Sequence, residues 1–223
     1  MALTKYNYNS FDLTTAASKG LAFNSSANGF ETAAEGSMTL IKTLTASSSG
    51  TLAFVNGSDS VVLDNTYPVY LFKFINIHAG TDDANFQFDT SDDTGSSYDT
   101  SKATTSFRAI HSEDGSGGAL AYRANADQGI SGSTYQTIAE NLDTDNDSNG
   151  CGELYLFNPS STTFVKHFLC RFTSHQNSEG GNQDQFTAGY INEGGSAIDA
   201  VLFRFHTGNI DAGTIKLYGI KDS

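Results

Sequence analysis

The chain has 223 residues and a formal net charge of −13, because 25 Asp and Glu outweigh 12 Lys and Arg. This acidity argues against a nucleic-acid partner, since phosphate binding requires a basic face. The 16 Phe and 10 Tyr are too many for a disordered chain, and the sequence has no apolar run long enough to insert into a membrane.

Residues 1–35 differ from the rest because their apolar residues follow neither a strand period nor a helix period. We expect an irregular N-terminal arm that anchors the protein to a neighbouring molecule. A mobile terminus and extra strands of the main domain are the alternatives. The expected anchoring residues are the apolar ones, Phe11, Leu21, Phe23 and Phe30.

From residue 36 onward, short apolar and alternating runs separated by turn residues predict strands. The strongest run is 68–78, whose two faces are both apolar, which indicates a central strand or one covered by a second layer. Tyr70, Phe72 and Phe74 share one face of this strand, and Ile75 and Ile77 share the other. The expected strands are 37–46, 51–55, 68–78, 85–89, 106–111, 119–123, 134–139, 151–157, 163–173, 185–192, 198–206 and 214–220.

This spacing of short strands, without a convincing amphipathic helix, predicts an all-β fold. We expect residues 36–223 to form one jelly-roll-like antiparallel β-sandwich domain, preceded by the arm at 1–35. Strands 151–157 and 163–173 form an expected hairpin across the turn sequence NPSST. Centring this hairpin on its turn places Cys151 almost opposite Cys170, which makes them a disulfide candidate; two buried free thiols are the alternative.

A run of acidic residues follows the strand expected at 134–139. Asp143, Asp145 and Asp147 recur at every second position, a spacing that lets one tight loop direct three carboxylates at a hard cation such as Ca²⁺. The match to an EF-hand loop fails, because Ser148 replaces the turn glycine and Leu154 the bidentate glutamate. The alternative is a solvated acidic turn. We expect no other cofactor.

The sequence contains no serine-hydrolase elbow, phosphate-binding loop, zinc-protease motif or dinucleotide fingerprint, so we expect no enzymatic activity. Aromatic residues in the strong strands are expected in the core or in a subunit interface, although exposed aromatics also form sugar-binding platforms. These residues are Tyr70, Phe72, Phe74, Tyr155, Phe157, Phe164, Phe168, Phe203 and Phe205.

Three segments carry a resemblance to a known family: 70–88 (YLFKFINIHAGTDDANFQF), 154–168 (LYLFNPSSTTFVKHF) and 196–220 (SAIDAVLFRFHTGNIDAGTIKLYGI). They resemble virion structural proteins of marine tailed bacteriophages, of the tail-fibre, appendage or capsid-decoration type. The resemblance covers residues 37–221, and its ending at 208–220 is the most specific part.

The resemblance implies a non-enzymatic component of a virion that is assembled in the cytoplasm of a host bacterium. Its partners would be capsid or tail proteins, and we expect a homo-oligomer, with a trimer favoured. The alternative function is a carbohydrate-binding module that contacts a host-surface glycan, with calcium held by the acidic loop.

Overall fold

The computed structural model describes residues 20–23, 26, 30–32, 36–130, 134–177 and 181–221. The chain divides into two compact units, residues 1–39 and 40–223. All regular structure in the described residues is β, and none of it is a helix that could cross a membrane.

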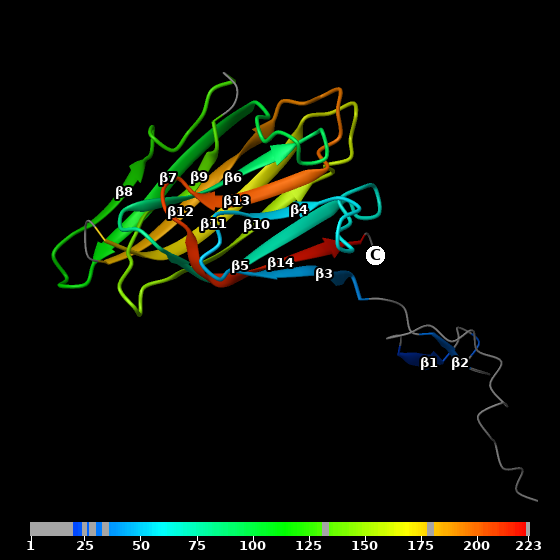
Figure 1. Cartoon of the computed structure of the whole chain (residues 1–223), viewed down its shortest axis with the longest axis horizontal. Helices are drawn as coiled ribbons and strands as arrows, with labels where there is room; N and C mark the ends of the chain where they lie inside the picture. The colour runs from blue at the N-terminus through cyan, green and yellow to red at the C-terminus, as the bar shows by residue number, and fades with distance from the viewer. Residues whose placement is uncertain are drawn as a thin grey trace, which may run out of the picture. The chain divides into compact units, whose positions relative to one another are not determined.

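The strands are labelled in Figure 1. They are β1 (Leu21–Phe23), β2 (Phe30–Thr32), β3 (Met38–Thr45), β4 (Leu52–Val55), β5 (Val69–Ala79), β6 (Ala84–Ser91), β7 (Lys102–Ser112), β8 (Gly118–Tyr122), β9 (Gln136–Leu142), β10 (Gly150–Phe157), β11 (Lys166–Gln176), β12 (Gly181–Ile191), β13 (Ala200–Phe205) and β14 (Ile210–Ile220).

Eight of these strands form a jelly roll, as the sequence predicted. They pair in a nested order: β3 with β14, β4 with β13, β5 with β10, and β6 with β9. Further pairing of β14 with β5 and of β13 with β6 gives two layers, β3-β14-β5-β10 and β4-β13-β6-β9, which are joined into one continuous sheet where β11 pairs with β9. Such a folded double layer buries one face of each sheet against the other.

Two hairpins are inserted into this jelly roll and extend its first sheet. The hairpin β7–β8 lies between β6 and β9 in sequence, and the hairpin β11–β12 lies between β10 and β13. Their pairing continues the sheet in the order β10-β11-β12-β7-β8. The enlarged sheet therefore has a wide outer face that the jelly roll alone would not provide.

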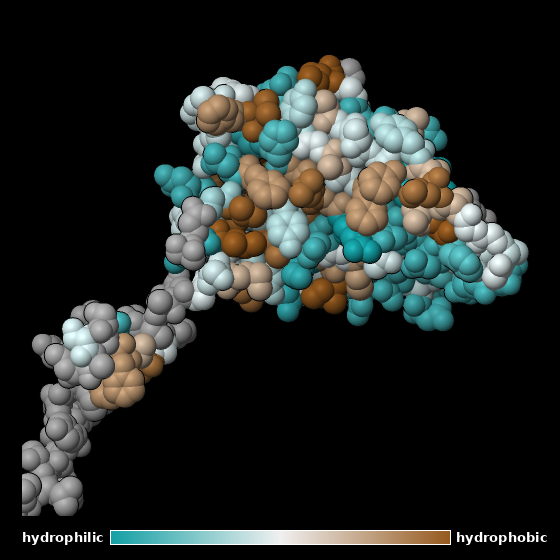
Figure 2. Space-filling model, turned by 180° about the vertical axis from the view of Figure 1, so that it is seen from behind, coloured by the Kyte–Doolittle hydropathy of each residue, from teal (hydrophilic) through white to brown (hydrophobic). Residues whose placement is uncertain are grey.

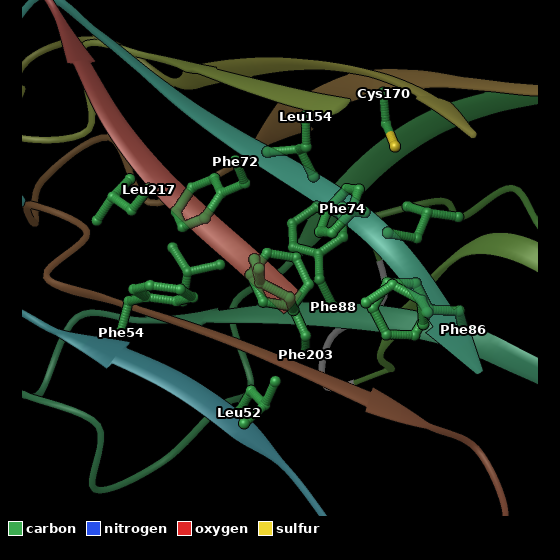
Figure 3. Close-up of a cluster of buried hydrophobic side chains, with 14 of the residues drawn as sticks. Leu52, Phe54, Phe72, Phe74, Phe86, Phe88, Leu154, Cys170, Phe203 and Leu217 are labelled. Atoms are coloured by element: carbon green, nitrogen blue, oxygen red, sulfur yellow. The ribbon is translucent and has the colours of Figure 1, made fainter. Parts of the chain in front are cut away.

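Phenylalanine rings from both sheets fill the space between them (Figure 3). Phe72 of β5, Phe86 and Phe88 of β6 and Phe203 of β13 are all 0% exposed. Phe203 lies 5.2 Å from Phe72 between ring centroids, with the rings inclined at 61°. Such edge-on contacts between large rings stabilise the core beyond simple area burial.

A bulge in β5 changes which side chains reach this core. Asn76 has a positive φ of 52°. In the pairing with β10, Gly152 lies opposite Phe74 but Gly150 lies opposite Ile77, so β5 has one residue more than β10 between these two pairs. Beyond the bulge, Ile77 is 0% exposed and joins the core, whereas Ile75 is 39% exposed. The prediction that Ile75 and Ile77 share a face was therefore wrong, because an extra residue reverses the alternation.

The N-terminal unit contains a small antiparallel hairpin in which β1 pairs with β2. The expectation of an irregular arm was therefore wrong for residues 21–23 and 30–32. The rings of Phe23 and Phe30 stack with centroids 4.9 Å apart, yet Phe23 is 70% exposed. Leu21 is also exposed, and Phe11 lies outside the described residues. Anchoring through these four side chains stays a prediction.

Candidate functional site

The inserted strands β7 and β12 turn a row of polar residues inward and turn the rings of Phe107 and Phe186 toward the other face. Ser106, Gln183 and Gln185 are 0% exposed, whereas Phe107 is 43% exposed. This reverses the usual arrangement, in which the apolar face of a sheet packs inward.

Hydrogen bonds between side chains satisfy this buried polar face. Arg108 donates to Gln183 Oε1 at 2.7 Å, and Gln183 Nε2 donates to the backbone oxygen of Glu140 at 3.1 Å. Gln185 Nε2 donates to Ser106 Oγ at 3.0 Å. Breaking such a network leaves buried polar groups without partners, which costs free energy. The network therefore fixes the orientation of β7 and β12 and holds Phe107 outward.

Apolar side chains from four strands form a continuous strip on the outer face of the enlarged sheet. We call this strip the outer band; its members are Phe107 of β7, Tyr155 and Phe157 of β10, Leu169 of β11 and Phe186 of β12. Phe107 lies opposite Phe186, and their rings stack at 5.0 Å and 8°. Tyr155 lies opposite Leu169, which is 52% exposed. In Figure 2, brown and tan atoms spread across the middle of the face that is shown, with teal atoms among them.

Charged side chains flank the outer band. The Arg171 guanidinium lies 4.9 Å from the centroid of Phe186 and pairs with Asp184 at 2.8 Å. Lys73 pairs with Glu153 at 3.3 Å, and Glu153 lies directly opposite Arg171 across β10 and β11. Glu153 and Arg171 border a hollow of about 390 Å³ that is also lined by Phe107, Tyr155, Leu169 and Phe186. An apolar centre with a charged rim is typical of a surface that binds another molecule.

The acidic loop after β9 places its three aspartates in different environments. Asp143 is 7% exposed, whereas Asp145 and Asp147 are exposed. The Asp143 carboxylate accepts hydrogen bonds from Ser148 Oγ at 3.1 Å and from the backbone nitrogen of Thr144 at 2.7 Å. Among the described residues, no three His, Cys, Asp or Glu side chains form a group suited to a metal ion. Calcium binding by the three aspartates stays a prediction.

Instead, Asp143 belongs to a cluster that ties the loop to the end of β11. His175 Nδ1 lies 3.0 Å from the Asp143 carboxylate and 2.7 Å from Ser148 Oγ. His175 Nε2 lies 3.3 Å from Glu113, in the β7–β8 turn. This grouping could not be predicted from the sequence, because its members come from three distant parts of the chain.

We expect the Asp143→Asn variant to lose stability at neutral pH and to match the wild type in acid. Burial alone raises the pKa of Asp143, but hydrogen bonds from the backbone nitrogens of Asp145 and Thr144 and from Ser148, together with His175, lower it below its usual value. A lowered pKa stabilises the fold above the unfolded-state pKa of about 3.9, and this contribution is lost as pH falls through the folded-state value.

Thermal unfolding of both proteins between neutral pH and about pH 3 measures this difference. Asp145→Asn is the matched control, because the Asp145 side chain is exposed in the same loop. A gap between wild type and Asp143→Asn that stays constant with pH would contradict the assignment.

The cysteines lie on opposite faces of the sheet and are both free. Cys170 is buried opposite Leu154, whereas half-buried Cys151 lies opposite Thr173. The disulfide candidate was therefore wrong, because the turn lies further along the chain than its sequence suggests. Thr163 and Phe164, expected at the start of a strand, instead donate backbone hydrogen bonds to Ser161 Oγ within the turn.

The aromatic residues selected from the sequence divide into three groups. Tyr70, Phe72, Phe74, Phe168, Phe203 and Phe205 are buried in the core. Tyr155 and Phe157 lie in the outer band, and Phe164 is 70% exposed in the turn. The other members of the band were not predicted, although buried and more exposed residues alternate along β11 and along most of β12. The chain matches no family model, no curated protein and no solved structure.

Proposed function

We propose that the protein is a non-enzymatic structural component of a tailed-bacteriophage virion, either a capsid decoration or head fibre, or a tail appendage. The observation that carries this proposal is the outer band, an apolar surface that a buried polar network holds outward. The jelly roll also supports it, because this architecture recurs in viral capsid proteins. The sequence resemblance of residues 37–221 to phage virion proteins points to the same role.

In this proposal the outer band packs against a second copy of the chain or another virion protein. Fully burying a Leu or Phe side chain contributes about 1.5–3 kcal/mol, and Phe107 and Leu169 are each about half exposed. Association must also offset lost translational and rotational freedom, so several such side chains have to be covered together. We propose a closed homo-oligomer, a trimer, attached to the particle through the N-terminal residues and assembled in the host bacterial cytoplasm.

Immunogold electron microscopy of purified phage particles, with antibody against the recombinant chain, tests this function. We expect gold label on intact particles: label around the head would make the protein a decoration or head fibre, and label on the tail an appendage. Particles without label that also lack the chain by mass spectrometry would overturn the proposal. Particles from a phage in which only the gene for this chain is deleted provide the control for antibody specificity.

The hollow in the outer band favours a second candidate, a carbohydrate-binding module for a host-surface glycan. Tyr155 offers a ring for stacking, and Glu153 and Arg171 provide hydrogen-bond partners at the rim. Jelly rolls also occur among lectins. Calcium bound at Asp143, Asp145 and Asp147 would belong to this candidate alone. If the chain is absent from purified particles and binds glycans, the carbohydrate-binding module is favoured over the structural role.

A further inference from the structure

A fully buried lysine and aspartate meet where the inserted hairpin β7–β8 leaves the jelly roll. Asp89 lies in β6, Lys102 begins β7, and both side chains are 0% exposed. Lys102 Nζ is in direct contact with Asp89 Oδ1 and donates to the backbone oxygen of Thr100 at 2.8 Å. The structure thus holds an amine against a carboxyl group and shields both from solvent.

The two oxygens of Asp89 have unequal surroundings. Oδ1 accepts hydrogen bonds from the backbone nitrogen of Thr90 at 2.7 Å and from Thr100 Oγ1 at 3.3 Å, besides its contact with Lys102. Oδ2 is buried and has no hydrogen-bond partner among the described residues. An ionised carboxylate would leave a charged oxygen uncompensated there, which is costly in a protein interior.

Burial favours the neutral forms of both groups. It raises the pKa of Asp89 despite the opposing effect of Lys102, and it lowers the pKa of Lys102 despite the opposing effect of Asp89. A neutral amine has a free electron pair, and a neutral carboxylic acid is an electrophile with a hydroxyl group to lose. In water the same two groups ionise, which blocks their reaction.

We propose that Lys102 and Asp89 condense into an intramolecular amide, an isopeptide bond between β6 and the start of β7. The Nζ electron pair forms a bond with Asp89 Cγ, and the resulting negative charge develops on Oδ1. The Thr90 N–H and the Thr100 hydroxyl already point at this atom, as donors do in an oxyanion hole. The Cγ–Oδ2 bond then breaks, and the Oδ2 hydroxyl leaves as water with one proton from Nζ.

Proximity and exclusion of water make this condensation favourable in the folded protein. Groups held in contact react as if they were present at a very high concentration. Because the site excludes solvent, little water is available there to hydrolyse the amide back to the amine and the acid. The amide would join residues that are 13 apart in sequence and fix β7, the strand that carries Phe107, to the jelly roll. The proposal does not rest on a virion function, and its test is independent of particle location.

Intact mass spectrometry of the denatured full-length chain tests the proposal. We expect the protein to be lighter by one water molecule than its sequence mass. Proteolysis should release one branched peptide that joins the segments around Asp89 and Lys102. A wild-type chain at full sequence mass, including after prolonged incubation of the folded protein, would overturn the proposal.

Substitutions identify which two residues lose the water molecule. Lys102→Met and Asp89→Ala should each have the full mass of their own sequence, with no water lost. This expectation holds whether or not the variants fold well, because each variant lacks one of the two reacting groups. Lys73→Met is the matched control, because Lys73 pairs with Glu153 on the surface, and this variant should keep the lower mass. Succinimide formation at Asp114 would also remove water, but that loss would persist in Lys102→Met and would contradict the isopeptide.

Discussion

Replacing Phe72 with alanine is expected to lower the free energy of unfolding by about 3–5 kcal/mol, the usual range for removing a buried phenylalanine. The Phe72 ring is 0% exposed and makes edge contacts with Phe54 at 5.4 Å and Phe203 at 5.2 Å. These partners come from the opposite sheet, in which β13 pairs on both sides, so the sheet has little freedom to collapse into the cavity.

Chemical denaturation of wild type and Phe72→Ala measures this loss. Phe164→Ala is the matched control, because Phe164 is 70% exposed in the turn between β10 and β11. The control should stay within about 0.5 kcal/mol of the wild type. Equal denaturation midpoints for the two variants would show that the Phe72 ring does not support the core.

The sequence was sufficient to predict the class of fold and much of the core. Strand β5 alternates large apolar residues strongly enough that Tyr70, Phe72 and Phe74 were assigned correctly to one face. It was not sufficient for local register. The bulge at Asn76 and the turn around Ser161 each shift the alternation, and neither has a distinctive residue pattern. An odd shift in register moves a side chain to the other face, which is why the disulfide prediction failed.

The candidate site was harder to predict than the fold. Alternation shows that the two faces of β7 differ, but hydrophobicity alone would turn Phe107 inward and Ser106 outward. The structure has the opposite orientation, because Gln183 and Gln185 of β12 give the buried face its hydrogen-bond partners. Since β12 follows β7 by many residues, only the sheet pairing brings these groups together. The buried contact between Lys102 and Asp89 depends on the same tertiary arrangement.

Gly152→Ala is expected to destabilise the fold by about 1–3 kcal/mol, the usual cost of adding atoms to a packed interior. A Cβ at this position would lie 2.4 Å from the backbone oxygen of Arg171 and 2.9 Å from Phe172 Cα. Both atoms belong to the backbone of β11, which is paired on its other side with β12, so neither can move away without disturbing the sheet. Thermal unfolding should show a clear fall in the melting temperature.

Gly195→Ala tests whether this loss comes from crowding and not from glycine replacement in general. A Cβ at Gly195 would meet no atom within 4 Å. Alanine there also reduces the conformational freedom of the unfolded chain, an effect of about 0.4–1 kcal/mol in favour of the fold where the backbone accepts it. The control should therefore melt at or slightly above the wild-type temperature. If Gly152→Ala behaves the same way, β10 and β11 are not packed as closely as the structure places them, and the outer band that they carry would lose its fixed geometry.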